Sequence, residues 1–251
     1  MKETIAVWFS CGAASAVAAK KTIELFGDTH NILIVNNPVK EEHDDNRRFL
    51  KDVEKWLCYP IIIASNRDLP DNSAVTVWNK RKYMSGVKGA PCTVLLKKEA
   101  RHQFELLNKI DYHVLGFTAD EKDRSDRFIK YERQNTIPVL IQCGYTKEDC
   151  FGILEAVGID LPYIYKLGYP NANCIGCVKA TGITYWNHVR KTFPEIFIER
   201  AKQSREIGCK LVKHKGQRIF LDELPEDAKG NKMKSHECGI FCETKLPKYE
   251  N

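Results

Sequence analysis

The sequence predicts an α/β fold, in which a doubly wound and mostly parallel Rossmann-like sheet is followed by a helical region that contains cysteines. Up to about residue 145, short runs rich in β-branched residues alternate with helix-forming segments. From Thr146 onward, helical segments and a Gly/Asn/Cys-rich stretch replace the strands. We therefore expect two domains, an α/β domain over residues 1–145 and a helical region over residues 146–251.

The predicted strands are apolar along their whole length, as expected for strands that are buried on both faces. They cover residues 5–9, 32–35, 61–63, 112–116 and 137–141. Helices are predicted where strong helix formers dominate or where apolar residues recur on one side. They cover residues 13–21, 44–57, 147–157 and 185–207.

The composition is that of an ordinary globular protein. The 251 residues are 43% hydrophobic and 29% charged, which excludes disorder as the main state. The 39 Lys and Arg residues against 33 Asp and Glu residues give a net charge of +6, an excess that suits phosphate-bearing ligands. No run approaches the roughly 20 apolar residues of a membrane helix, so we expect a soluble, cytoplasmic protein, and we expect it to form homo-oligomers.

The segment from Ser10 to Ser15 lies between the first predicted strand and the first predicted helix. Backbone N–H groups and the positive end of a helix dipole can hold a phosphate at such a position. Small side chains let a phosphate oxygen approach the backbone, and Gly12, the alanines and the serines meet that requirement. A plain strand-to-helix turn is the alternative for these six residues alone.

Phe9 to Ser15 resembles the Ser-Gly-Gly-x-Asp-Ser pyrophosphate loop (PP-loop) of the adenine nucleotide α-hydrolase superfamily, specifically its phosphoadenosine phosphosulfate (PAPS) reductase branch. Residues 91–98, 115–124 and 174–177 resemble later segments of that family in the same order. Cys11 replaces the first glycine and Ala14 replaces the acidic residue, which weakens any role of the loop in positioning magnesium. The nucleotide-binding residues that the resemblance implies are Ser10, Cys11, Gly12, Ala13, Ala14, Ser15, Asn36, Gly116, Glu121, Arg124 and Arg127.

The sequence contains ten cysteines, and Cys174 and Cys177 have the C-x-x-C spacing that lets two thiolates bind one metal centre. The resemblance adds Cys92, and the C-terminal tail offers Cys242 as a fourth ligand. A [4Fe-4S] cluster is the cofactor that the family implies. Zinc is the alternative, because four cysteines suit its tetrahedral preference equally well.

The tail segment Glu237-Cys238-Gly239-Ile240 resembles the Glu-Cys-Gly-Leu-His signature whose cysteine attacks the sulfonucleotide in PAPS reductases. Cys238 is therefore the candidate catalytic nucleophile. Phe241 stands where the signature has histidine, so Cys238 is also a candidate metal ligand.

Three functions follow from these features. The first is a PAPS reductase-like enzyme that binds ATP or a PAPS-type adenine nucleotide, with magnesium as a candidate cofactor and a thiol or thioredoxin-type protein as electron donor. The second is an ATP-pyrophosphatase that adenylates a nucleic acid before sulfur insertion, as in DNA phosphorothioation or tRNA thiolation. The third is a nucleotide sensor without catalysis, suggested by the replacements at Ala14 and Phe241.

Overall fold

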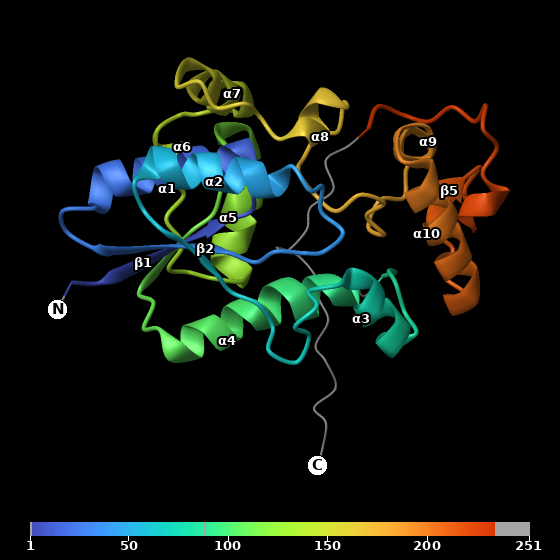
Figure 1. Ribbon diagram of the computed structural model, residues 1–251, viewed down its shortest axis with the longest axis horizontal. Coiled ribbons are helices and arrows are strands. Elements are labelled where there is room, and N and C mark those ends of the chain that lie inside the picture. Colours follow the sequence, from blue (N-terminus) through green and yellow to red (C-terminus); the bar gives the residue numbers. More distant parts are fainter. Residues whose placement is uncertain (1, 88, 234–251) are drawn as a thin grey trace, which may run out of the picture. The chain divides into compact units, whose positions relative to one another are not determined.

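The computed structural model describes residues 2–87 and 89–233, and these residues form two compact units. The first unit consists of Met1–Pro38, Glu42–Arg67 and Ala100–Ala172 (Figure 1). The second unit consists of Val39–Glu41, Asp68–Glu99 and the described residues from Asn173 onward. The boundary expected between residues 145 and 146 falls inside the first unit, and residues 68–99 join the second unit from within the expected α/β domain.

The first unit is built on a parallel four-stranded sheet with the strand order β3-β2-β1-β4, which confirms the predicted fold class. Each strand contains all or part of an apolar run that the sequence indicated. The strands are β1 (Thr4–Phe9), β2 (Asn31–Asn36), β3 (Ile61–Ile63) and β4 (Tyr112–Val114). In the register of β1 with β2, Phe9 pairs with Asn36, so both strands end at the same edge of the sheet.

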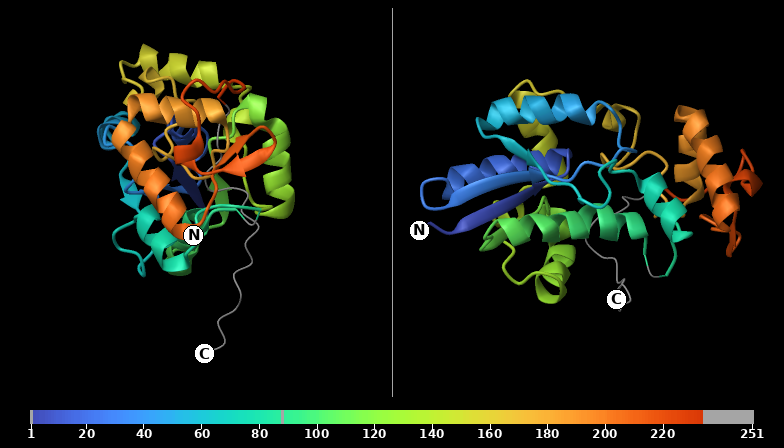
Figure 2. Two further views of the ribbon diagram at one scale, coloured as in Figure 1. Left: turned by 90° about the vertical axis from the view of Figure 1, so that its right-hand side faces the viewer. Right: turned by 60° about the horizontal axis from the view of Figure 1, so that its bottom comes forward.

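Helices cover both faces of this sheet, as Figures 1 and 2 show. Ile5, Val7 and Phe9 lie in the main core with residues of α1 (Ala13–Phe26), α2 (Asn46–Leu57) and α7 (Lys147–Ala156). Trp8 points to the other face, where its ring meets Phe104 of α4 (Glu99–Leu107) at 6.0 Å between centroids. The alternation of side chains along β1 therefore supplies a core on each side of the sheet.

The predicted strand over residues 137–141 is wrong, because the chain forms the short helix α6 (Val139–Gln142) there. Only a single parallel bridge, between Thr136 and His113, links this segment to the sheet in the described residues. Pro138 has no N–H to donate to a strand ladder. Val139 and Leu140 are fully buried against the main core from the helix, so the apolar run is buried without forming a strand.

The predicted helix over residues 185–207 is two helices, α9 (Ile183–Thr192) and α10 (Pro194–Ile207). Proline disfavours a helical conformation in the residue before it, and Phe193 has a φ of −139°. Pro194 is instead the first residue of the second helix, where its missing N–H costs nothing.

The remaining elements are short. They are α3 (Ala74–Arg81), the π-helix η1 (Thr93–Lys98), η2 (Ala119–Glu121), α5 (Lys122–Tyr131), α8 (Tyr163–Lys166), β5 (Val212–His214), β6 (Gln217–Ile219) and η3 (Leu221–Glu223). Across the part of the chain that the structure describes, no helix has both the length and the apolar character needed to span a membrane.

Candidate phosphate site and cysteine turn

The turn from β1 into α1 is closed by the side chain of Ser15. The Ser15 hydroxyl accepts hydrogen bonds from the N–H groups of Ser10, at 3.1 Å, and Gly12, at 3.3 Å, and it donates to the carbonyl of Gly12 at 2.8 Å. Ser15 is only 4% exposed. One buried hydroxyl therefore fixes the path of the chain around the first turn of α1, at the carboxyl edge of the parallel sheet, where open α/β folds bind ligands.

Cys11 is a packing residue within this turn. It has a left-handed backbone with a φ of 55°, and its side chain is buried in the main core. The side-chain amide of Asn36 donates to the carbonyl of Phe9 at 2.8 Å and lies 3.5 Å from the Cys11 sulfur. Asn36 thus holds the inner side of the turn from the end of β2, and the buried Cys11 thiol is not placed for reaction with solutes.

Gly116 packs directly against the same turn. A Cβ atom at this position would lie 2.7 Å from the Ser15 nitrogen and 2.9 Å from the Ala14 carbonyl carbon. Both are backbone atoms, so they cannot move aside as a flexible side chain would. The glycine that follows β4 is therefore required for the close approach of two backbones.

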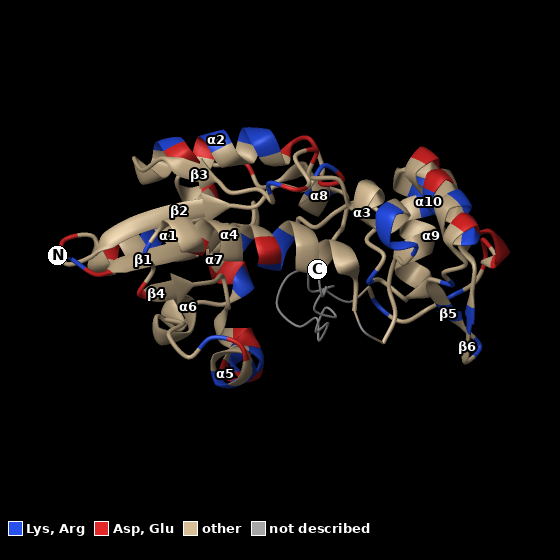
Figure 3. Ribbon diagram, turned by 90° about the horizontal axis from the view of Figure 1, so that it is seen from below, with Lys and Arg blue, Asp and Glu red and all other residues tan. Residues whose placement is uncertain are grey.

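The predicted nucleotide-binding residues that follow Gly116 interact mainly with one another and with their neighbours in the chain. Glu121 accepts from the N–H of Thr118 at 3.3 Å and is ion-paired with Arg124, whose guanidinium lies 5.2 Å from the ring centre of Phe117. Arg127 is exposed, and its Nε donates to the carbonyl of Asp123 at 3.3 Å. Figure 3 shows charges of both signs along α5, which carries both arginines. Arg124 is partly neutralised within the protein, and Arg127 lies on a mixed-charge surface.

Two residues that the sequence did not reveal adjoin the Ser10–Ser15 turn. The Tyr165 hydroxyl has backbone hydrogen bonds with Ala13 and Ala172, and burial raises the pKa of this phenol to about 12 despite those bonds. The hydroxyl lies 3.3 Å from the point where a Cβ on Gly12 would be. Lys147 places its ammonium 5.5 Å from the centre of the Tyr165 ring. No short motif marks either residue, because both lie more than a hundred positions from the turn.

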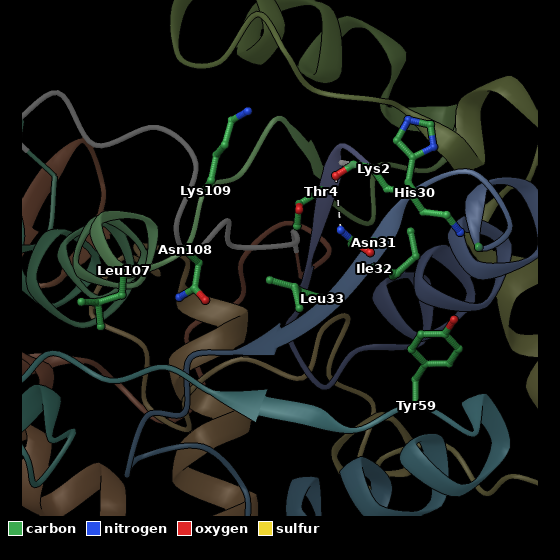
Figure 4. Close-up of a pocket in the computed structure, with 11 residues that line it drawn as sticks. Lys2, Thr4, His30, Asn31, Ile32, Leu33, Tyr59, Leu107, Asn108 and Lys109 are labelled. Atoms are coloured by element: carbon green, nitrogen blue, oxygen red, sulfur yellow. Dashed lines mark hydrogen bonds between the residues drawn. The ribbon is translucent and has the colours of Figure 1, made fainter.

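A surface pocket of the first unit lies at the other edge of the sheet (Figure 4). It is lined by Thr4 and Asn31, the first residues of β1 and β2, together with Lys2, His30 and Lys109. Since Ser10 follows the last residue of β1, this pocket and the Ser10–Ser15 turn are at opposite ends of the same strand. The pocket is therefore separate from the predicted phosphate site.

In the second unit, residues from two helices hold the turn that contains Cys174 and Cys177. Gly176 has a left-handed φ of 66°. The N–H of Cys177 donates to the Tyr185 hydroxyl at 2.8 Å, and the Nε of Arg200 donates to the carbonyl of Gly176 at 3.2 Å. Cys177 is buried and Cys174 is half-buried. The turn is thus fixed through its backbone, and neither bond uses a cysteine sulfur.

Arg200 gives this turn a buried positive charge. Its side chain is 1% exposed, and its guanidinium lies 4.5 Å from the centre of the Trp78 ring. Burial lowers the pKa of Arg200, while the nearby Glu41 carboxylate and the Cys174 sulfur act in the opposite direction. A buried cation beside Cys174 is electrostatically complementary to an anionic metal–thiolate centre.

Three of the four predicted metal ligands, Cys92, Cys174 and Cys177, are among the described residues, and the fourth, Cys242, is not. Cys92, at the start of η1, belongs to the same unit as Cys174 and Cys177. Among the residues with a described position, no three His, Cys, Asp or Glu side chains gather as metal ligands. Cys238 and Cys242 lie beyond residue 233. The four-cysteine ligand set and the nucleophile Cys238 therefore stay predictions, and the Cys174–Cys177 pair with Arg200 fits a thiolate-bound metal.

Comparisons with known proteins do not assign this chain to a family. No family model matches the chain, and no curated protein does. A solved structure that is similar to it is the U34-tRNA thiolase NcsA from Methanococcus maripaludis with its [4Fe-4S] cluster. The identity is 11%, the match covers 82% of this chain and 72% of the thiolase, and the TM-score is 0.40. What the structure itself defines is an α/β protein with a strand-to-helix turn at the carboxyl edge of its parallel sheet.

Proposed function

We propose that this chain is an enzyme of sulfur chemistry that binds an adenine nucleotide, with nucleotide phosphate on the Ser10–Ser15 turn. The observation that carries the proposal is the turn itself, closed by the buried Ser15 hydroxyl between β1 and α1. The first N–H groups of a helix have no partner within the helix, so they form a ready site for a phosphate. Ala14 leaves the turn without the carboxylate that would position magnesium.

The cysteine turn of the second unit supports the sulfur chemistry in this proposal. Cys174 and Cys177, with Cys92 and Cys242, would hold a [4Fe-4S] cluster or a zinc ion, and the buried Arg200 would balance part of its negative charge. An iron–sulfur cluster supplies electron transfer or a site for a labile sulfur when it is bound. Tyr185 and Arg200 hold the backbone of this turn by hydrogen bonds.

Two forms of the reaction agree with these sites. In a PAPS reductase-like reaction, the Cys238 thiolate attacks the sulfur of a sulfonucleotide, the S–O bond to the nucleotide phosphate breaks, and the nucleotide leaves. A dithiol or thioredoxin-type donor then attacks the Cys238 sulfur, releases sulfite, and is itself oxidised to a disulfide. In an ATP-pyrophosphatase, an oxygen of a nucleic acid attacks the α-phosphorus of ATP and pyrophosphate leaves. The replacement of histidine by Phe241 favours the second form, because that histidine accompanies the reductase nucleophile in the signature.

The nucleotide site is tested by calorimetric titration of the wild type and of Ser15→Ala with ATP and PAPS. We expect Ser15→Ala to weaken binding about tenfold or more, since the hydrogen bonds that hold the backbone of Ser10 and Gly12 in the shape of the turn are lost. Ser204→Ala is the matched control, because it removes an equally buried hydroxyl from α10 in the second unit. Equal affinities in the wild type and Ser15→Ala contradict the site.

The two reactions are separated by their products. Release of pyrophosphate from ATP only in the presence of a nucleic acid establishes the pyrophosphatase form, whereas release of sulfite from PAPS in the presence of a dithiol establishes the reductase form. Binding of nucleotide without either product identifies the chain as a nucleotide sensor.

The metal site is tested by the iron, zinc and sulfide content of protein purified without oxygen. We expect Cys177→Ser to lose the metal and to destabilise the second unit, because the free energy of metal binding contributes to folding. Cys58→Ser is the control, since Cys58 is an exposed cysteine of the first unit. Unchanged metal content in Cys177→Ser contradicts the assignment.

A further inference from the structure

Lys147 is a positive charge in an unfavourable place. It is the first residue of α7, where the positive end of the helix dipole repels a cation. Burial lowers the pKa of its ammonium group, and the largest opposing influence is the charge of Glu121. The ammonium donates to the carbonyl of Pro170 and to the Asn171 side-chain oxygen, which lies 2.9 Å away, and both acceptors are neutral. A desolvated cation held by neutral oxygens is well placed to receive an anion.

Tyr165 connects this cation to the Ser10–Ser15 turn. Its ring lies beneath the Lys147 ammonium, 5.5 Å from ring centre to nitrogen, and packs edge-on against Phe151 at 5.2 Å between centroids. Its hydroxyl is hydrogen-bonded to the backbone of Ala13, the first residue of α1. The first turn of α1 is where the proposed function places a phosphate, so the Tyr165 hydroxyl occupies a hydrogen-bonding position that a phosphate oxygen would take.

We propose that Lys147 and Tyr165 form one wall of the nucleotide site. Tyr165 satisfies the Ala13 backbone until a phosphate oxygen replaces its hydroxyl, and Lys147 then binds a second anionic group of the same ligand. This inference rests on the proposed function and makes it more specific. The preferred ligands are adenine nucleotides that carry at least two anionic groups in a chain, because a monophosphate engages only the helix end.

The role of the hydroxyl is tested with Tyr165→Phe, which keeps the ring packed against Phe151 and beneath Lys147. We expect this variant to bind ATP about fivefold or more tightly than the wild type, since the Ala13 N–H has lost its internal acceptor before the nucleotide arrives. Tyr112→Phe, on β4 of the same unit, is the control and keeps the wild-type affinity. If Tyr165→Phe binds ATP with unchanged or weaker affinity, a phosphate oxygen does not replace the Tyr165 hydroxyl, and this part of the proposal is overturned.

The role of the cation is tested with Lys147→Met, which keeps the length and the apolar stem of the side chain. We expect ATP and ADP to bind about tenfold more weakly and AMP to bind with little change, because only the longer phosphate chains reach the ammonium. The melting temperature should stay the same or rise, since a desolvated charge is removed. Lys130→Met, on α5, controls for the loss of one positive charge.

The results separate this inference from the proposed function. If the wild type binds ATP and Ser15→Ala weakens that binding, the phosphate site is correct. If Lys147→Met then loses equal affinity for AMP and ATP, or loses affinity for neither, only the proposed wall of Lys147 and Tyr165 is overturned. If the wild type binds no adenine nucleotide, both the proposed function and the wall are overturned.

Discussion

The Ser10–Ser15 turn of the first unit and the Cys174–Cys177 turn of the second unit each contain a residue in the left-handed backbone conformation, but different means hold them in place. The first has Cys11 at a φ of 55° and is closed by Ser15, a residue of the turn itself. The second has Gly176 at a φ of 66° and is held by Tyr185 and Arg200, which are 8 and 24 residues from their partners. A locally closed turn can be recognised from a short motif. When residues of distant helices hold a turn, the sequence reveals only the cysteines of the turn and not the residues that support it.

The residues in the left-handed conformation also differ in what they require. Glycine adopts it without penalty, whereas for another residue it costs about 1 kcal/mol. Cys11 maintains it inside the core, with the Asn36 amide beside its sulfur. The first turn is thus stabilised by its surroundings as well as by its own hydrogen bonds. Substitutions around each turn measure how much the surrounding residues contribute to its stability.

The largest effect is expected from Gly116→Ala, which places an added methyl group against the backbone of the first turn. The added Cβ would lie 2.7 Å from the Ser15 nitrogen, so the turn or β4 must move. We expect the free energy of unfolding to fall by about 3 kcal/mol and nucleotide binding to be lost. Urea denaturation and titration measure the two effects. Gly152→Ala is the control, because nothing lies within 4 Å of its Cβ position in α7 and alanine favours a helix. A mild effect of Gly116→Ala would show that the turn adapts.

The next effect, counted per pH unit, is acid destabilisation of the first unit through His113 of β4. Burial, together with the charges of Arg133 and Arg101, lowers the pKa of His113 from 6.5 to about 3. The unfolded chain then binds this proton at a higher pH than the folded chain does. The contribution to stability is complete above pH 6.5 and is lost as the pH falls toward 3, by up to about 1.4 kcal/mol per pH unit.

This dependence is measured by urea unfolding at a series of pH values, with His113→Gln expected to flatten the profile between pH 6.5 and pH 3. His102→Gln, at an exposed position of α4, is the matched control. If the stability of His113→Gln falls with pH as steeply as that of the wild type, the acid sensitivity belongs to another group.

The smallest effect is expected from Tyr185→Phe, which removes the hydroxyl that accepts the N–H of Cys177. We expect a loss of about 1 kcal/mol in the stability of the second unit, because a backbone donor in a buried turn loses its partner. Nucleotide affinity should stay at the wild-type value, and metal content should fall. Hydrogen exchange at the Cys177 amide locates the change. A loss of nucleotide affinity without faster exchange there would contradict the assignment of this hydroxyl to the cysteine turn.

Much of the first unit was predictable because its determinants are local. The apolar runs at residues 5–9, 32–35 and 61–63 are strands, and the small residues from Ser10 to Ser15 form the strand-to-helix turn. The run at residues 137–141 is equally apolar, and it became a helix because Pro138 and burial against the main core outweighed β-branched character. Pro194 divided the last long helix for a comparable local reason.

The surroundings of each turn could not be predicted. Tyr165, with Lys147 over its ring, reaches the first turn only after the chain has folded. The same is true of Tyr185 and Arg200 at the second turn. A tyrosine or a buried arginine at these positions matches no motif, and nothing in one sequence reveals such a distant pair. The four-cysteine set, the nucleophile and the cofactor stay predictions, since Cys238 and Cys242 are outside the described residues.

The interleaved composition of the two units has a consequence for the order of folding. The first unit contains residues up to Ala172, and the second contains residues 68–99 as well as residues from Asn173 onward. During synthesis from the N-terminus, residues 68–99 leave the ribosome long before most of their partners, while the first unit can complete its core. Until those partners are synthesised, residues 68–99 cannot bury their apolar side chains, which include the buried indole of Trp78. The interval before α9 and α10 emerge is therefore when this chain is most exposed to aggregation and to chaperones.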